Sequence, residues 1–499
     1  MAIMGLDVGT TGSKAVVFDL DGKILAGSYR EYNLHSPHPG WLELDPHDVL
    51  SAVKTVVSEA TARCNTKIQA VAMSLLGEAG LPVDKNYEPL ANAIIGFDPR
   101  GDAQCRAFRK KIDPCELFVI TGHAANSFHT LFKILHLKEQ SPEVFSKMHK
   151  FLCFGDFIAA KLGFEPIMDH SMAARTLMFD VNKRTWSDKI LNLAGLDKSL
   201  LPKLAAPGAP IGTIGKNDLG FPEGALLAAG LHDQPAGILG AGISPGESML
   251  ATGTVVCMGI LLNQDVCAAA MTKNNLCRYP TFGDNFISIC WNFTGGVALK
   301  WFRDNFAQDL IEKAKKENTD VYNLITANLP KDPTKLILLP YFTTTGTPYL
   351  DTQASAMLMG LNLNANRFDI ARSIMEGIAY ELRLNQELLG EAEVSINLYK
   401  AIGGAAKSEF WMQLYADILN RPISILQTTE CAAWGVALMG AHAAGLLKEN
   451  PDVVARKVSS TGKQYTPREE NVKAYNARLE IYSELYPKNK ELIHKLSAL

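Results

Sequence analysis

A glycine-rich turn between two short apolar runs, at the start of the chain, is the feature that most constrains its fold. Ile3 to Leu6 predicts a buried strand, and Ala15 to Phe18 predicts a second strand that closes a β-hairpin. The turn is Gly9-Thr10-Thr11-Gly12. Glycines let a ligand approach the backbone closely, and successive N–H groups with threonine hydroxyls suit phosphate oxygens. Asp7, at the strand end, is the candidate for holding Mg²⁺ directly or through water. An ordinary hairpin with an acidic end is the alternative interpretation.

A second segment of the same shape begins halfway along the chain. Glu247 to Ala251 predicts a strand, Thr252-Gly253-Thr254 a turn, and Val255 to Ile260 a second strand. The two hairpins together resemble the phosphate loops of the actin, Hsp70 and sugar-kinase superfamily. This resemblance implies an α/β fold of two actin-like (ribonuclease H-like) ATPase domains, with the nucleotide and the active site in the cleft between them.

Length and composition agree with a two-domain globular protein. The chain has 499 residues, which is too long for a single hydrophobic core. Apolar residues make up 47% and charged residues 20%, as in an ordinary globular protein. The net charge of −3 gives no electrostatic reason to expect nucleic acid or an anionic membrane as a partner.

The cysteine pattern indicates a reducing compartment. Nine cysteines are scattered with no Cys-x-x-Cys pair, so neither a disulfide framework nor a zinc site is expected. We expect a cytoplasmic protein, since the N-terminus lacks the pattern of a secretory leader and the apolar stretches are too interrupted to cross a membrane.

Alternating strand-like and amphipathic segments run along both halves of the chain. We expect an N-terminal domain over 1–245, a C-terminal domain over 246–447 and a helical extension over 448–499, in which 468–495 mixes both charge signs like a solvated helix surface. Helices are expected at 46–63, 131–140, 156–162, 367–389, 410–419 and 434–444. Strands are expected at 68–74, 225–230, 336–341 and 398–402.

Four motifs, in order over most of the chain, resemble the FGGY family of carbohydrate kinases. They are Leu6-Asp7-Val8-Gly9-Thr10-Thr11, Gly230-Leu231-His232-Asp233-Gln234-Pro235-Ala236-Gly237, Thr294-Gly295-Gly296-Val297-Ala298-Leu299-Lys300-Trp301-Phe302-Arg303-Asp304 and Ala401-Ile402-Gly403-Gly404-Ala405-Ala406-Lys407-Ser408. The resemblance implies an ATP-dependent kinase that phosphorylates a hydroxyl of a small sugar, such as a pentulose, or of a polyol. It also implies ATP and Mg²⁺ as cofactors. Relatives are often dimers, so the resemblance is compatible with a homodimer.

Asp233 is the candidate catalytic base. It follows an apolar strand and precedes Pro235, a residue favoured in the first turn of a helix. A helix N-terminus stabilises a carboxylate by about 0.3–1 kcal/mol, which keeps it ionised and ready to orient a hydroxyl. A simple helix cap is the alternative interpretation of Asp233.

The same resemblance implies which residues contact ATP. The candidates are Thr10, Thr11, Gly12, Lys14, Gly253, Thr254, Gly296, Lys300, Gly404 and Ser408, with Asp7 for the metal. Bare backbone at 403 and 404 would let a flat base lie against the turn, although a plain strand-to-helix turn also needs glycine. The alternative interpretation of Lys14 is a solvated lysine on the hairpin.

The substrate candidates lie at the ends of first-domain strands, where ligands bind in open α/β sheets. They are Gly77, Glu78, Asp98, Arg100, Asp233 and Gln234. Gly77 lacks the side chain that glycerol-type relatives use, while Glu78 is expected either to accept hydrogen bonds from substrate hydroxyls or to be a solvent-exposed loop acid. Asp98 and Arg100 either bind substrate or brace the loop. For Asp169-His170-Ser171 a structural role is expected.

Two other nucleotide-binding classes do not fit the sequence. No Gly-x-x-x-x-Gly-Lys-Ser/Thr motif occurs, and the spacing in 240–246 is wrong for a dinucleotide loop. The remaining alternative is a catalytically silent ATP- and sugar-binding sensor of the same fold, against which the retention of Asp233 argues. In a kinase, closure of the cleft on the substrate is expected to exclude water.

Overall fold

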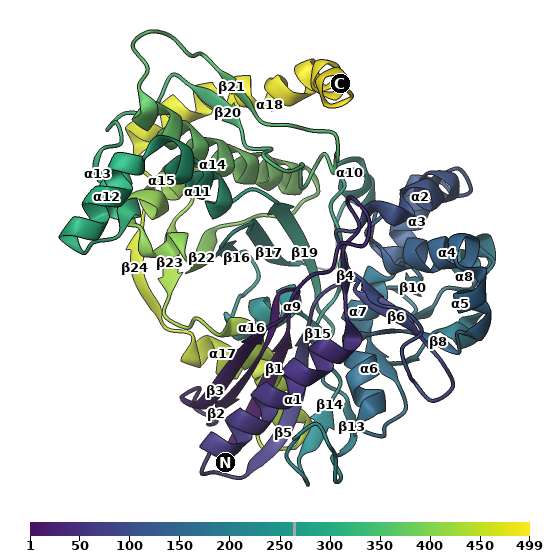
Figure 1. Cartoon of the computed structure of the whole chain (residues 1–499). Coiled ribbons are helices and arrows are strands. Elements are labelled where there is room, and N and C mark those ends of the chain that lie inside the picture. The colour runs from purple at the N-terminus through teal and green to yellow at the C-terminus, as the bar shows by residue number, and fades with distance from the viewer. Residues whose placement is uncertain (263–265) are drawn as a thin grey trace. The chain divides into compact units, whose positions relative to one another are not determined.

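The computed structural model describes residues 1–262 and 266–499, which form two compact units (Figure 1). The first unit contains Met1–Ile243, Cys277–Ile287 and Glu430–Ser459, and the second contains Ser244–Leu276, Ser288–Thr429 and Ser460–Leu499. The sequence led us to expect three consecutive segments, 1–245, 246–447 and 448–499. The first unit instead takes up two later stretches of chain, because their side chains complete its core.

The first unit is built on a mixed sheet with strand order β13-β14-β5-β1-β2-β3, to which β15 adds by pairing with β5. Its strands are β1 (Ala2–Val8), β2 (Gly12–Phe18), β3 (Ile24–Glu31), β5 (Ile68–Leu75), β13 (Pro210–Thr213), β14 (Leu226–Ala228) and β15 (Leu231–His232). The antiparallel β1–β2 pair is the hairpin that the sequence predicts. The parallel β1–β5 register places Asp7 opposite Ser74.

Two helices cover this sheet, and one of them comes from far along the chain (Figure 1). Helix α1 (Pro46–Arg63) packs on β2 and β3, with Asp45 accepting a hydrogen bond from the His47 N–H at its start. Helix α16 (Cys431–Ala443) packs on β1 and β5. A Cβ added at Gly5 would overlap the carbonyl oxygen of Ala433, so this strand and this helix are in close backbone contact.

The remainder of the first unit carries short helices and small sheets. The helices are α2 (Asp102–Arg109), α3 (Pro114–Thr121), α4 (Thr130–Gln140), α5 (Pro142–Lys147), α6 (Phe154–Lys161), α7 (His170–Arg175), α8 (Asp188–Ala194), α9 (Asp233–Gly240) and α17 (Pro451–Val458). The strands are β4 (Glu43–Leu44), β6 (Gly80–Val83), β7 (Ala93–Ile94), β8 (Lys150–Cys153), β9 (Ile167–Asp169), β10 (Phe179–Asp180), β11 (Thr185–Trp186), β12 (Lys203–Ala205) and β18 (Tyr279–Pro280).

The second unit repeats the arrangement of a hairpin followed by a parallel strand. Its sheet contains the order β19-β17-β16-β22-β23-β24, in which β16 pairs antiparallel with β17 and parallel with β22. The strands are β16 (Glu247–Thr252), β17 (Val256–Leu262), β19 (Phe286–Asn292), β22 (Leu398–Gly403), β23 (Ile423–Leu426) and β24 (Thr461–Tyr465), with a separate pair β20 (Ile337–Leu339) and β21 (Met357–Met359). This β16–β17 pair is the second hairpin that the sequence predicts.

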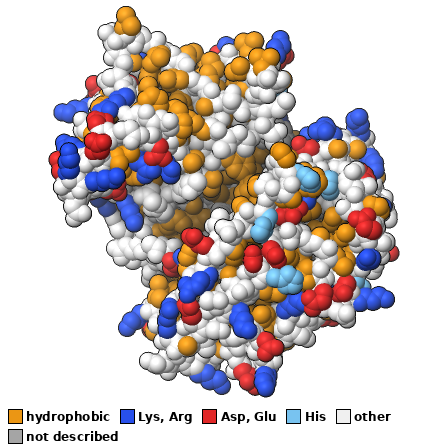
Figure 2. All heavy atoms as spheres, viewed as in Figure 1, with side chains coloured by type: hydrophobic (Ala, Val, Ile, Leu, Met, Phe, Trp, Pro, Cys, Tyr) orange, Lys and Arg blue, Asp and Glu red, His pale blue; other side chains and the backbone are white. Residues whose placement is uncertain are grey.

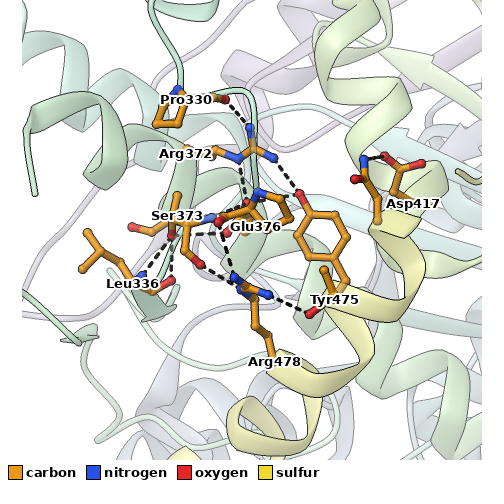
Figure 3. Close-up of polar contacts among 12 residues, drawn as sticks. Pro330, Leu336, Arg372, Ser373, Glu376, Asp417, Tyr475 and Arg478 are labelled. Carbon is orange, nitrogen blue, oxygen red and sulfur yellow. Dashed lines mark hydrogen bonds and ion pairs between the residues drawn. The ribbon is translucent and has the colours of Figure 1, made fainter. Parts of the chain in front are cut away.

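The helices of the second unit are α10 (Ala268–Lys273), α11 (Gly296–Phe306), α12 (Gln308–Glu317), α13 (Val321–Ala327), α14 (Arg367–Glu391), α15 (Glu409–Leu419) and α18 (Glu469–Ser497). Helix α14 is buried along most of its length and carries a buried ion pair between Arg372 and Glu376, 2.7 Å apart. Tyr475 from α18 accepts a hydrogen bond from Arg372 at 2.8 Å and contacts Glu376 at 3.1 Å (Figure 3). This network ties α18 to the centre of the unit.

Helix α18 therefore differs from the solvated surface that its mixed charges predict. Tyr475, Tyr482 and Tyr486 are almost fully buried, because their spacing places them on one helix face. Most of the charged residues lie on the opposite face, where pairs such as Lys488 with Glu484 form, while Arg478 donates to the Thr334 carbonyl oxygen at 2.8 Å. The composition of the segment masked an amphipathic pattern with an aromatic stripe.

Lys and Arg side chains are interspersed with Asp and Glu over the face shown in Figure 2. This agrees with the small net charge of −3. Within the described ranges, none of the helices combines the length and the apolarity that a membrane span requires.

Candidate functional site

Asp233 is the first residue of α9, directly after β15, and the N-cap position belongs to His232. The interpretation of Asp233 as the capping residue is therefore wrong. His232 Nε2 lies 3.1 Å from Asp233 Oδ1, yet this buried oxygen accepts no hydrogen bond among the described residues. The Asp233 side chain is 37% exposed. Desolvation, together with the charge of Asp7, raises the pKa of Asp233 to about 7.

His232 fixes the surroundings of Asp233. Its Nδ1 is 2.9 Å from the hydroxyl of Tyr279, and its backbone N–H donates to Ser171 Oγ at 2.9 Å. Burial and the charge of Arg175 hold the pKa of His232 well below its usual value, so the ring is neutral. A Cβ added at Gly77 would lie 2.6 Å from His232 Nε2. Position 77 is therefore a glycine because His232 occupies the space of a side chain.

Glu78 lies in the interior, which excludes the interpretation of a solvent-exposed loop acid. Only 6% of the residue is exposed, and its carboxylate forms an ion pair with Arg175. Its carbonyl oxygen accepts a hydrogen bond from Lys133 Nζ at 2.6 Å. The backbone of Glu78 has a φ of 59°, a left-handed conformation that is uncommon outside glycine and often occurs at functional sites.

Arg175, His123, His129, Lys133 and Tyr279 surround Glu78 and His232 and were not expected from the sequence. Arg175 Nη1 is 3.2 Å from His123 Nε2, and burial with the Arg175 charge lowers the pKa of His123 to about 3. Burial lowers the pKa of Lys133 to about 8, an effect that Glu78 partly offsets. Tyr279 follows the second hairpin in the sequence, more than a hundred residues after His123, His129 and Lys133. No local pattern in the sequence connects these residues, although Arg175 follows the Asp169-His170-Ser171 segment closely.

Asp98 and Arg100 brace the chain. Arg100 donates to Asp98 through Nε at 2.8 Å and through Nη2 at 2.7 Å, and through Nη1 to Glu43 at 2.7 Å. The Leu42 N–H also donates to Asp98, and the guanidinium of Arg100 lies 4.1 Å from the Trp41 ring centroid. Both side chains are buried and their polar atoms are engaged by the protein. Of the two interpretations from the sequence, the geometry favours bracing.

The first hairpin brings Asp7 and Lys14 opposite each other in the β1–β2 register. Ser74 Oγ donates to Asp7 Oδ1 at 2.7 Å. Burial raises the pKa of Asp7, while Ser74 and Lys14 counteract the rise. Lys14 pairs with Glu430 at 3.0 Å and is half-buried, so it differs from the freely solvated lysine of the alternative interpretation. The turn residues Thr10, Thr11 and Gly12 lie beside this pair.

A pocket of about 540 Å³ lies within the second unit. Its lining includes all six nucleotide candidates from this half of the chain, namely Gly253, Thr254, Gly296, Lys300, Gly404 and Ser408. Gly253 closes the turn of the second hairpin, and its carbonyl oxygen accepts from the Gly296 N–H at 2.9 Å. Ser408 Oγ caps α15 by accepting from the Trp411 N–H, which leaves its hydroxyl hydrogen available for a ligand. Lys300 pairs with Asp304 at 2.7 Å.

The pocket has the size and composition of a small-molecule site. Gly403 has a φ of 100°, and Gly404 follows it with open space on its Cβ side, so the turn presents bare backbone to the pocket. Asp320, Tyr322, Asn323 and Thr326 line another wall. These four residues of the α13 region were not expected from the sequence.

Comparison with known proteins identifies the family of this two-unit fold, which has a glycine-threonine hairpin in each unit. The chain belongs to the FGGY family of carbohydrate kinases: the N-terminal domain of that family matches residues 2–240 and the C-terminal domain matches residues 250–444. Members of this family are ATP-dependent phosphotransferases, as the sequence led us to expect.

The most similar curated proteins include several xylulose kinases. The chain is 27% identical to the xylulose kinase of Bacillus subtilis (strain 168) over 98% of this chain and 97% of that protein. It is 29% identical to the glycerol kinase of Shewanella piezotolerans, over 89% of this chain and 90% of that protein. Among solved structures, a ligand-bound xylulose kinase from Lactobacillus acidophilus has a TM-score of 0.88 at 23% identity, covering 99% of both chains. These similarities confirm the two-domain α/β fold of the FGGY kinases.

Proposed function

We propose that the protein transfers the γ-phosphoryl group of ATP to a hydroxyl of a small sugar, such as a pentulose, or of a polyol. Asp233 is the proton acceptor in this proposal. The observation that carries it is the buried Asp233 oxygen without a hydrogen-bond partner, at the end of a sheet strand and beside Glu78 and Asp7. A pKa of about 7 suits a group that must accept a proton near neutral pH.

The chemistry requires orientation, a proton acceptor and neutralisation of phosphate charge. Asp233 accepts a hydrogen bond from the reacting hydroxyl, whose oxygen attacks the γ-phosphorus, and the proton passes to the carboxylate as ADP leaves. Gln234, whose buried Oε1 also lacks a hydrogen-bond partner, would accept from a second hydroxyl. Glu78 would accept from others, while Gly77 leaves room for His232 beside the base.

The first hairpin is assigned to the phosphates of ATP. The backbone N–H groups and hydroxyls of Thr10, Thr11 and Gly12 would donate to phosphate oxygens, and Lys14 would exchange Glu430 for phosphate. Asp7 suits Mg²⁺, since a magnesium ion in such sites takes one or two carboxylates together with substrate phosphates. Bound Mg²⁺ would neutralise the charge that develops on the phosphates.

The pocket of the second unit is assigned to adenosine. Gly404 and Gly296 would lie against the base, Ser408 would donate its hydroxyl hydrogen, and Gly253, Thr254 and Lys300 would meet the phosphate end. The domain roles follow from these assignments: sugar and metal on residues of the first unit, nucleotide base on the second.

The scattered spacing of the nine cysteines supports the proposal of a reducing compartment such as the cytoplasm.

The test measures ADP release from Mg-ATP with a panel of pentuloses, hexuloses, polyols and glycerol, for the wild type and for Asp233→Asn. We expect one compound to stimulate ADP release, and the variant to lose this stimulation by about 10²–10⁴-fold. ATP binding without stimulation by any compound would overturn the kinase and favour a sensor of the same fold.

A further inference from the structure

We propose that the buried Glu78–Arg175 ion pair selects substrates by charge, so that the site accepts neutral sugars or polyols and rejects the corresponding sugar acids. The inference rests on the proposed function, because it assigns the surroundings of Asp233 to the sugar. It narrows the substrate to uncharged sugars and polyols. It also names Arg175 as a specificity residue whose positive charge is neutralised by Glu78.

Arg175 is a cation whose binding capacity is not fully used. Its side chain is 6% exposed, Nη2 contacts Glu78 Oε1, and Nη1 is 3.2 Å from His123 Nε2. Its Nε is buried and makes no hydrogen bond among the described residues. The rings of Phe128 and Tyr279 lie 5.3 and 5.6 Å from the guanidinium carbon. A guanidinium with this geometry binds a carboxylate strongly, and here the carboxylate is the protein's own.

A short chain of contacts connects this ion pair to the catalytic carboxylate. Glu78 follows Gly77, which lies against His232, and His232 Nε2 is 3.1 Å from Asp233 Oδ1. Both Glu78 and Arg175 act electrostatically on Asp233. A sugar whose hydroxyl reaches Asp233 therefore places its other substituents within the field of the ion pair.

The balance of charge around Asp233 disfavours a further anion. Asp7, Glu78 and Asp233 are carboxylates, and the cation that acts on Asp233 together with them is Arg175, already neutralised by Glu78. Lys133 is directed to the carbonyl oxygen of Glu78. His123, His129 and His232 are buried and neutral. A sugar hydroxyl finds hydrogen-bond acceptors here, whereas a sugar carboxylate meets the carboxyl groups of Asp7, Glu78 and Asp233 and an arginine that Glu78 already pairs.

Removing the charge of Glu78 without changing its shape reverses this balance. In Glu78→Gln the Arg175 guanidinium keeps its position and loses its counterion, so an incoming carboxylate would take the place of the lost one. Leaving a buried charge unpaired also lowers stability, which a bound acid would restore. Glu78→Asp keeps the negative charge and is the matched comparison.

The experiment uses three pairs of compounds with the same carbon number, one neutral and one acidic: glycerol and glycerate, xylitol and xylonate, glucitol and gluconate. For each pair we measure kcat/KM and, by calorimetry without ATP, the affinity of the full-length protein. We expect the wild type to prefer the neutral member of every pair that it uses. Glu78→Gln should shift the acid-to-neutral ratio toward the acid by about 10- to 100-fold.

Glu78→Asp should keep the preference for the neutral compound. Glu59→Gln, which removes a partly exposed carboxylate elsewhere in the first unit, should leave the ratio unchanged. A wild type that uses the acid of any pair as well as the neutral compound overturns the inference and leaves the kinase in place, and this result stands even when Glu78→Gln does not fold. A folded Glu78→Gln with an unshifted ratio overturns it as well. Where the wild type uses a pentulose or a hexulose, that ketose replaces the polyol of the same carbon number as the neutral member of the pair. A protein that binds and phosphorylates no polyol, ketose or acid of these pairs overturns both the inference and the proposed function.

Discussion

The backbone N–H of His232 donates a hydrogen bond to Ser171 Oγ at 2.9 Å, which joins the first turn of α7 to the residue that precedes Asp233. Ser171 in turn donates to Asp169, whose carboxylate caps α7. All three residues are buried. The orientation of the candidate base therefore depends on the helix that also carries Arg175.

Replacing Ser171 with alanine should lower kcat while leaving ATP binding intact. The His232 N–H would lose its buried acceptor, which costs about 1–3 kcal/mol of stability, and Asp233 would be less well oriented. Steady-state kinetics with the best substrate, together with calorimetry for ATP, distinguish the two effects. An unchanged kcat would mean that Ser171 serves stability alone.

The kcat/KM of the enzyme should fall as the pH is lowered through about 7. Because the pKa of Asp233 is raised to about 7, mainly by desolvation, the carboxylate that accepts the proton is depleted below that pH. We expect kcat/KM to rise with pH and to level off above pH 8. A profile that stays flat from pH 5 to 8 would exclude Asp233 as the group that titrates.

The same shift predicts a pH-dependent gain in stability for Asp233→Asn. Asp233 has a raised pKa in the folded state and one near 3.8 when unfolded, so the folded state binds more protons between these values and loses stability as the pH rises from about 4 to 7. Asparagine has no such dependence. In thermal unfolding, the stability of Asp233→Asn relative to the wild type should increase from about pH 4 to pH 7 and stay constant above pH 8. The partial exposure of the Asp233 side chain will reduce the size of this increase.

Two adjacent glycines should respond differently to alanine. Gly404 has no atom closer than 4.0 Å to an added Cβ, so Gly404→Ala should fold normally and weaken ATP binding by narrowing the pocket. Gly403 has a φ of 100°, and its Cβ would lie 2.5 Å from the Thr252 carbonyl oxygen, so Gly403→Ala should destabilise the fold. Chemical denaturation and the KM for ATP measure the two effects. Equal ATP affinity in Gly404→Ala and the wild type would remove Gly404 from the nucleotide site.

The buried ion pair of α14 should matter far more to stability than an exposed one on the same helix. Glu376→Gln leaves Arg372 buried without its counterion, so we expect a loss of about 3–5 kcal/mol in the free energy of unfolding. Glu387→Gln removes a pair with Arg383 of the same i,i+4 spacing, in which the glutamate is 47% exposed, and should cost about 0–0.5 kcal/mol. Urea denaturation of both variants tests the difference, and equal losses would contradict it.

Local patterns predicted the elements that depend on neighbouring residues. The hairpin glycines and threonines, the helix that begins at Pro46 and the apolar spacing of 367–389 each carry their own signal, and the structure has these elements close to the expected bounds. Capping residues and periodicity act within a few residues of chain, which is the range that a single sequence makes visible.

The candidate site shows what a sequence leaves out. The identity of Asp233 and Glu78 was visible from motifs, but their surroundings come from Arg175, His123 and Tyr279, which lie far apart in the chain. Glu78 pairs with Arg175, and Asp98 and Arg100 brace a loop, because all of them are buried. Burial depends on packing between distant segments of the chain. The aromatic stripe of α18 is a different case, because its spacing was present in the sequence and the mixed charges concealed it.

The return of α16 to the first unit sets the order in which the protein can mature on the ribosome. Ala433, Trp434, Ala437 and Leu438 complete the core over β1, yet they are synthesised about 190 residues after Ile243, the end of the long N-terminal stretch of that unit. At translation rates of about 5–20 residues per second, the N-terminal stretch that ends at Ile243 waits on the order of 10–40 s for the helix that covers β1 and β5. During that interval the nascent sheet exposes an apolar face, so the early-synthesised half of this kinase is a natural client for chaperones that bind emerging chains.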